Sequence, residues 1–252
     1  MRHAGLVAFL LVLPGCIHSA DPPETNSPAA VGPARGAGGA IMSALPSNLT
    51  LAFLRPGTEM ALLAAVDGNA VLINTGPAQD SLLTDWVTRV GVRQVSLLLI
   101  TDPATPFAGG CAQLASTVAV ALVVAPPGTP CEGAPAARTI DSLRLGQVLQ
   151  VGHISIGIVN VEPLVATLDY GAVRILVAPT PACRTLTRLS AEGLAAPDLL
   201  QLAQTSPCQA WEPPPRTVAF ASASSPASHI DPLGTGEAIT FSSDGTTLHR
   251  RI

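Results

Sequence analysis

The chain contains no lysine and few aromatic residues, and both shortages bear on its function. All 13 basic residues among the 252 are arginines, aromatic residues make up 3%, and the net charge is −4. Proteins that bind nucleic acids usually present a basic stripe to the phosphates, and single-strand binders add exposed aromatic rings for stacking. Here the arginines are scattered, and Arg250 and Arg251 form their only adjacent pair. Direct nucleic-acid binding is therefore not expected.

Charged residues are also scarce, at 12%, whereas hydrophobic residues reach 48%. A chain of about 200 residues with this composition can bury the core of one ordinary domain. Beyond the first 16 residues, no stretch is long and apolar enough to span a membrane. We therefore expect a single folded domain over residues 48–252.

The first residues predict a lipoprotein signal. The apolar run Ala4–Leu13 leads into Leu13-Pro14-Gly15-Cys16, which resembles the bacterial lipobox. We expect a signal peptide over residues 1–15 and lipidation of Cys16, where each acyl CH₂ adds roughly 0.8 kcal/mol of membrane affinity. An ordinary secretory signal with an incidental cysteine is the alternative.

Residues 16–47 predict a tether between this anchor and the domain. The segment is rich in proline, alanine, glycine and serine and has no periodic apolar pattern, as in flexible linkers. Ile17, rather than an aspartate, follows Cys16 and favours the outer membrane. The expected location is thus the bacterial cell envelope, with the protein anchored by lipid and facing the periplasm.

Four further cysteines follow Cys16, and none belongs to a C-x-x-C pair, so a zinc knuckle is not indicated. In an oxidising compartment an even number of cysteines indicates disulfides. We predict that Cys183 pairs with Cys208 and Cys111 with Cys131, because the first two follow strands whose ends should converge. Four free thiols are the alternative.

Apolar runs and turn residues predict a mixed α/β domain. The predicted strands span residues 48–54, 61–65, 70–74, 95–100, 118–124, 149–161, 165–168, 173–177, 198–202, 217–220, 238–241 and 246–249. The predicted helices span residues 80–90, 112–117 and 184–194. Asp67-Gly68-Asn69 is a strong hairpin signal between two strands. This order predicts an α/β sandwich with helices on its outer faces.

Several stretches resemble one known superfamily in both order and spacing. Val71–Pro77 (VLINTGP) is similar to V-L-I-D-T-G-P, with Asn74 in place of the acid. Thr101, Gly109 and Gly110 match the frame of T-H-x-H-x-D-H-x-G-G. These patterns belong to the metallo-β-lactamase superfamily and, within it, to the soluble C-terminal domain of ComEC-type competence proteins. The resemblance covers residues 48–252 and implies a four-layer αββα metallo-β-lactamase-like sandwich.

The same resemblance implies that the metal site is lost. The family's ligand positions hold Asp102, Ala104, Pro106, Phe107, Thr180 and Gln204, and only His229 falls near a family histidine. A two-zinc site needs several histidines and bridging carboxylates, whereas the domain has only His153, His229 and His249. No zinc or other cofactor is therefore expected.

Three functions stay open. The leading hypothesis is a pseudoenzyme whose former cleft binds an envelope protein or a small ligand. The alternative is a hydrolase of phosphodiesters or esters with a non-standard site around Asp102 and His229. A purely structural lipoprotein is the third. Ser222, Ser224 and Ser225 precede His229 and Asp231, but the chain has no G-x-S-x-G elbow, so a serine hydrolase is disfavoured.

Overall fold

The fold is described from a computed structural model, which covers residues 47–135, 138–139, 142–178, 183–191, 197–202, 218–221 and 230–251. The predicted signal peptide, the lipidation site Cys16 and the predicted tether up to residue 46 lie outside these residues. No helix in the described part of the chain is long and apolar enough to cross a membrane.

Among the described residues, the first β-sheet has nine strands in the order β16-β15-β1-β2-β3-β4-β6-β7, and β5 also pairs with β4. The strands are β1 (Leu49–Leu54), β2 (Ala61–Val66), β3 (Asn69–Ile73), β4 (Gln94–Leu99), β5 (Ala119–Val120), β6 (Val123–Ala125), β7 (Arg138–Thr139), β15 (Ala238–Ser243) and β16 (Leu248–Arg251). The pairs from β3 to β7 are parallel, and the remaining pairs are antiparallel.

The second sheet has seven strands among the described residues, in the order β14-β13-β12-β11-β10-β9-β8. They are β8 (Val148–Val151), β9 (Ile154–Asn160), β10 (Val165–Tyr170), β11 (Val173–Ala178), β12 (Leu199–Leu202), β13 (Val218–Ala221) and β14 (Ile230–Pro232). The strands from β11 to β14 are parallel to one another, whereas those from β8 to β11 alternate in direction.

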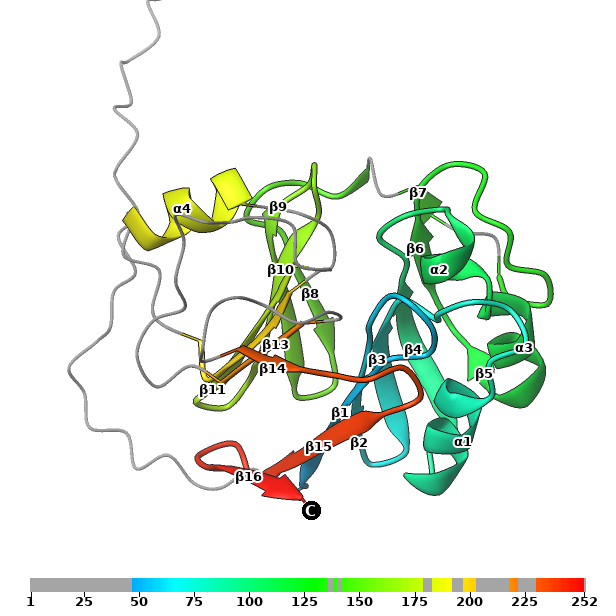
Figure 1. The fold of residues 1–252 in the computed structure, drawn as a ribbon, viewed down its shortest axis with the longest axis horizontal. Coiled ribbons are helices and arrows are strands. Elements are labelled where there is room, and N and C mark those ends of the chain that lie inside the picture. Colours follow the sequence, from blue (N-terminus) through cyan, green and yellow to red (C-terminus); the bar gives the residue numbers. More distant parts are fainter. Residues whose placement is uncertain are drawn as a thin grey trace, which may run out of the picture. The chain divides into compact units, whose positions relative to one another are not determined.

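Helices cover the outer face of each sheet (Figure 1). They are α1 (Leu82–Arg89), α2 (Thr105–Ala108), α3 (Cys111–Thr117) and α4 (Cys183–Ala191). Leu83 of α1 and Leu114 of α3 pack on the first sheet, and Leu186 of α4 packs on the second. The described elements therefore form four layers, αββα, and the predicted α/β class and layer order are confirmed.

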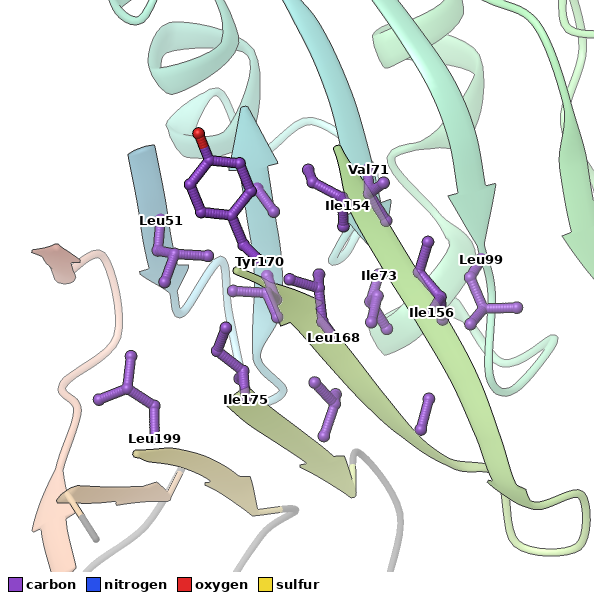
Figure 2. Packing of buried hydrophobic residues seen from close by; sticks show 14 of the residues in the cluster. Leu51, Val71, Ile73, Leu99, Ile154, Ile156, Leu168, Tyr170, Ile175 and Leu199 are labelled. Carbon is purple, nitrogen blue, oxygen red and sulfur yellow. The ribbon is translucent and has the colours of Figure 1, made fainter. Parts of the chain in front are cut away.

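The main core lies between the two sheets, where side chains from both meet (Figure 2). Successive side chains of a strand point to opposite faces. Val71 and Ile73 of β3 accordingly join the core between the sheets, whereas Ala70 and Leu72 join the layer under the helices. Because both faces are covered, the strand sequence is apolar without alternation, as expected for a strand buried on both sides.

Two predicted strands differ from the structure. The strand predicted over 118–124 is divided into two short strands, β5 and β6, which both pair with β4. The strand predicted over 149–161 is a hairpin of β8 and β9. Gly152 sits in the turn of this hairpin with a φ of 56°, a left-handed backbone that favours glycine. The continuous apolar pattern concealed this turn, and the short elements α2, β7 and β14 were not predicted.

The predicted hairpin between β2 and β3 is confirmed. Asp67 and Gly68 both have positive φ, 53° and 77°, as a two-residue turn of type I′ requires. The turn sets the register, in which Val66 lies opposite Asn69. A shift by one residue would turn the apolar set of β3 to the wrong face.

Candidate functional site

The parallel strands of both sheets end at the same end of the sandwich. At one end, the Tyr170 hydroxyl before β11 donates a hydrogen bond to the carbonyl of Ser47 before β1. At the other, Nη1 of Arg55 after β1 donates to the carbonyl of Leu233 after β14, at 2.6 Å. Strands β3, β4, β11 and β12 therefore terminate together, at what we call the site end. In open α/β sheets, ligands bind outside the carboxyl ends of the strands.

Asn74 joins the ends of β3 and β4. Its Oδ1 accepts hydrogen bonds from the backbone N–H and the hydroxyl of Thr101, at 2.9 and 3.0 Å. Asn74 is fully buried and has a φ of 62°, which asparagine tolerates better than most residues. A neutral amide thus anchors the loop that follows β4.

Asp102 is the one acidic residue of this loop, and it serves the local turn. Its Oδ1 accepts the backbone N–H of Ala104 at 2.8 Å, which is an Asx turn leading into α2. Pro106 lies in the first turn of α2, where proline's missing N–H costs little. The loop in which the family pattern places ligands is therefore a turn followed by a short helix.

Backbone contacts hold α2 against the loop after β3. The carbonyl of Phe107 accepts the backbone N–H of Thr75 at 2.7 Å and its hydroxyl at 3.2 Å. The predicted glycine pair makes this approach possible. A Cβ on Gly109 would lie 2.6 Å from the backbone nitrogen of Ala78, and one on Gly110 would lie 2.8 Å from the carbonyl oxygen of Thr75.

The described residues of the loop after β4 offer few of the side-chain atoms that a metal centre needs. Zinc in proteins is held by cysteine, histidine, aspartate or glutamate side chains, and Ala104, Pro106 and Phe107 offer none of these atoms. Within the described ranges, no group of three or more such residues could hold a metal ion. His153 lies in the β8–β9 turn and His249 in β16, both toward the opposite end of the sandwich, which we call the far end.

Several predicted site residues cannot be placed. Thr180, Gln204 and His229 lie outside the described residues, as do Cys208 and the serines Ser222, Ser224 and Ser225. The neighbouring strands are described: β11 ends at Ala178, β12 at Leu202, and β14 begins at Ile230.

One predicted disulfide is confirmed. Cys111 at the start of α3 is bonded to Cys131, with a Cα–Cα distance of 5.0 Å. This bond ties the glycine pair and α3 to the loop after β6. The backbone of Cys183 begins α4, but its predicted pairing with Cys208 falls outside the described residues.

A charged group from the β1–β2 loop also lies at the site end, and the sequence reasoning missed it. Burial raises the pKa of Glu59, the positive charge of Arg55 opposes this shift, and the negative charge of Asp102 adds to it. The carboxylate of Asp102, on a different loop, therefore acts electrostatically on Glu59. The available signal was that Arg55 and Glu59 are the only charged residues between 48 and 66.

Buried polar atoms without a partner also gather at this end. Among the described residues they are Nε of Arg55, Nδ2 of Asn74, and Nε2 and Oε1 of Gln201 in β12. Three of these four atoms are N–H donors. A buried donor without an acceptor costs about 1–3 kcal/mol, and native proteins keep few of them, often where a water, ion or ligand supplies the partner.

Comparison with known proteins gives structural likeness only. No protein-family model and no curated protein matches the sequence. The chain is similar to MEM-A1, a subclass B3 metallo-β-lactamase isolated from a soil metagenome library, at 13% identity and a TM-score of 0.46, over 64% of this chain and 77% of the other.

Two further solved structures are similar at the same level. Metallo-β-lactamase SMB-1 bound to 2-mercaptoethanesulfonate has 12% identity and a TM-score of 0.45, over 64% of this chain and 81% of the other. The metallo-β-lactamase fold protein YhfI from Bacillus subtilis has 8% identity and a TM-score of 0.46, over 64% and 72%. The layers and topology described above rest on the strand pairing of this chain itself.

Proposed function

We propose that this chain is a lipid-anchored protein of the bacterial envelope, related to the metallo-β-lactamase superfamily, whose site end binds a partner or ligand and does not hydrolyse a substrate. The resemblance to the ComEC-type domain supports the family relation, because the matching stretches keep its order. The lipobox-like sequence ending in Cys16 supports the anchor.

The observation that carries this proposal is the conversion of the ligand loop into a hydrogen-bonded clamp. Asp102 accepts a hydrogen bond that closes a turn. The carbonyl of Phe107 accepts hydrogen bonds from the backbone N–H and the hydroxyl of Thr75, and the side chain of Asn74 accepts one from the backbone N–H of Thr101. A metal loop must instead leave its side chains free to converge on the ion. Every one of these polar contacts stabilises the protein's own backbone.

The unpartnered donors indicate what this end binds. Asn74 and Gln201 are fully buried, and each has an amide N–H group without an acceptor. Arg55 adds an unpartnered Nε–H. Such donors fit an occupant with acceptor oxygens, such as a carboxylate or the backbone carbonyls of a partner's loop.

A hydrolase remains the second candidate because one observation favours it. Burial raises the pKa of Glu59 and the charge of Asp102 adds to this shift, and a pair of carboxyl groups is a common arrangement for acid–base catalysis. In this candidate, Glu59 would act as the general acid toward a leaving group and Asp102 would accept a proton from water.

Activity on two chromogenic esters separates the candidates. The full chain is incubated with bis(p-nitrophenyl) phosphate and with p-nitrophenyl acetate, beside Glu59→Gln and the exposed control Glu132→Gln. We expect all three proteins to release p-nitrophenol at the buffer rate. Release that Glu59→Gln abolishes and Glu132→Gln keeps would establish the hydrolase and overturn the binding proposal.

The anchor is tested separately. The wild-type chain is expected in the detergent phase of a Triton X-114 partition, and Cys16→Ser in the aqueous phase, because acyl chains supply the membrane affinity. Cys183→Ser is the matched control and should partition like the wild type. Equal partitioning of the wild type and Cys16→Ser would exclude lipidation at Cys16.

A further inference from the structure

A groove that none of the site residues touches lies toward the far end of the sandwich. It is a cavity of about 670 Å³, lined by the whole of β8 on one side and by Leu97 and Leu122 of the first sheet on the other. Asp67 and Asn69 from the β2–β3 turn and His153 from the β8–β9 turn form its polar part. Its volume lies within the range of known ligand pockets, about 300–1,000 Å³. We call it the β8 groove.

Strand β8 borders this groove as an edge strand. It is the last strand of the second sheet and, among the described residues, pairs only with β9, through Val148–Val151 opposite Ile154–Gly157. An edge strand presents a row of unpaired N–H and C=O groups that can pair with another chain. Proteins usually protect such edges with charged residues or proline, but β8 reads Val-Leu-Gln-Val.

The apolar side chains around β8 are unusually exposed. Leu145 and Val148 are the exposed large hydrophobic residues of the described chain, at 66% and 61%. Val148 lines the groove, whereas Leu145 lies three residues earlier and does not. Leu149 and Val151, on the other face of the strand, also line the groove and pack against the main core. The outward face of β8 thus offers apolar surface beside free backbone groups.

The polar part of the groove carries negative charge. The carboxylate of Asp67 lines this part and accepts a hydrogen bond from the hydroxyl of Ser47. Arg93 donates instead to the backbone carbonyl of Asp67, at 2.7 Å. Burial raises the pKa of Tyr170, and the negative charges of Asp67 and Asp244 raise it further.

We propose that β8 binds an extended peptide segment of a partner protein, which adds as an eighth strand to the second sheet and directs a basic group toward Asp67. Backbone hydrogen bonds to β8 would supply affinity, and the groove would accept alternate apolar side chains, as in other cases of strand addition. The carboxylate of Asp67 in the groove is the reason for assigning a basic group to the peptide, and a second copy of this chain is an outcome of the test below.

The test uses a random heptapeptide library displayed on phage and selected on the full chain. We expect the selected peptides to alternate apolar and polar residues and to carry lysine or arginine near one end. Val148→Asp should weaken binding of the best selected peptide at least about tenfold, because it places a charge on the apolar wall. Leu145→Asp, equally exposed but outside the groove, is the matched control and should bind within about twofold of the wild type.

A second variant tests the charge. Asp67→Asn keeps an oxygen for the Ser47 hydroxyl and tolerates the left-handed backbone of this position. It should lower the affinity for a basic peptide about fivefold and leave that for a neutral analogue unchanged. The proposal is overturned if no peptide is enriched, if Val148→Asp and Leu145→Asp weaken binding equally, or if sedimentation shows a wild-type dimer that Val148→Asp dissociates.

Discussion

The site end and the far end of the sandwich are formed by the same two sheets, yet their polar groups are used in opposite ways. At the site end, Asn74 and Thr75 bond backbone groups of the neighbouring loop after β4, and Asp102 bonds the backbone of its own turn. At the far end, the β8 groove is open, Val148 is 61% exposed, and β8 is an edge strand among the described residues.

This difference teaches that a sequence pattern at a site does not by itself say which contacts its residues make. Thr101 and the glycine pair match the family frame, and the structure shows that they serve close backbone packing. The surface that we propose for a partner lies along β8, outside the stretches that resemble the family. The predictions below compare how much stability the protein loses when residues at the site end and at the far end are substituted.

The largest expected loss follows removal of the disulfide at the site end. Cys111 and Cys131 are 20 residues apart, and a bond closing a loop of this size stabilises a domain by about 3 kcal/mol. The double variant Cys111→Ser, Cys131→Ser should lose this amount in guanidinium denaturation. Wild-type protein treated with reductant should reproduce the loss, and a change below about 1 kcal/mol would show that the disulfide does not stabilise the site end.

A methyl group at the glycine pair should cost about 2 kcal/mol. In Gly110→Ala the new Cβ would lie 2.8 Å from a backbone carbonyl, so the two loops must separate, and overpacking of this kind costs about 1–3 kcal/mol. Gly152→Ala at the far end is the comparison. It meets no heavy atom within 4 Å and should lose only about 1 kcal/mol, through its positive φ. Equal losses of stability in the two variants would show that the site end is no more tightly packed than the far end.

Asn74→Ala should destabilise the protein by about 1.5 kcal/mol, because Thr101 loses the acceptor of two hydrogen bonds. Asn74→Gly separates the two causes, since glycine relieves the left-handed φ and still lacks the acceptor. Urea denaturation should find both variants less stable than the wild type, with Asn74→Gly the milder. A glycine variant as stable as the wild type would show that the hydrogen bonds contribute nothing.

The raised pKa of Glu59 should make the free energy of unfolding depend on pH. Burial, opposed by Arg55 and assisted by Asp102, raises its pKa in the folded state above the ordinary 4.5. The folded protein therefore holds this proton to a higher pH than the unfolded chain, and stability falls as the pH rises from about 4.5 through the folded pKa. Glu59→Gln should match the wild type below this window and exceed it above. Parallel pH curves for the two proteins would refute the assignment.

The smallest effect is expected at β8. Val148→Asp alters an exposed side chain, so its free energy of unfolding should stay within about 0.5 kcal/mol of the wild type. Leu145→Asp should behave in the same way. A loss above about 1 kcal/mol for Val148→Asp alone would mean that this side chain is already packed, and that the groove is closed in solution.

Most strands were predictable because apolar runs report burial directly. Asp67-Gly68-Asn69 predicted its hairpin, and the proposed pairing of Cys111 with Cys131 is confirmed. The turn at Gly152 was not predictable, because apolar residues surround it on both sides and a lone glycine also occurs within strands. The local sequence pattern therefore predicted where most strands lie, but it did not predict the turn that divides one apolar run into two strands.

The site was predictable only in part. The side chains of Ala104, Pro106 and Phe107 cannot coordinate a metal, and the prediction that the metal ligands are lost rests on this together with the family resemblance. The influence of Asp102 on Glu59 was beyond reach, because the two residues belong to separate loops and come together only through the pairing of β1, β2, β3 and β4. The hydrogen bonds of Asn74 and Thr75 likewise form only because the loops after β3 and β4 lie close together, and a local sequence pattern does not predict which loops meet.

The most direct test of the central claim is the metal content of the purified full chain after loading with zinc and manganese, read by inductively coupled plasma mass spectrometry. A site whose loop serves backbone packing should retain less than about a tenth of an equivalent after dialysis, since binding needs several deprotonated ligands in place. Retention near one equivalent, lost in Asp102→Asn, would contradict the account and restore a metal-dependent hydrolase as the function of the site end.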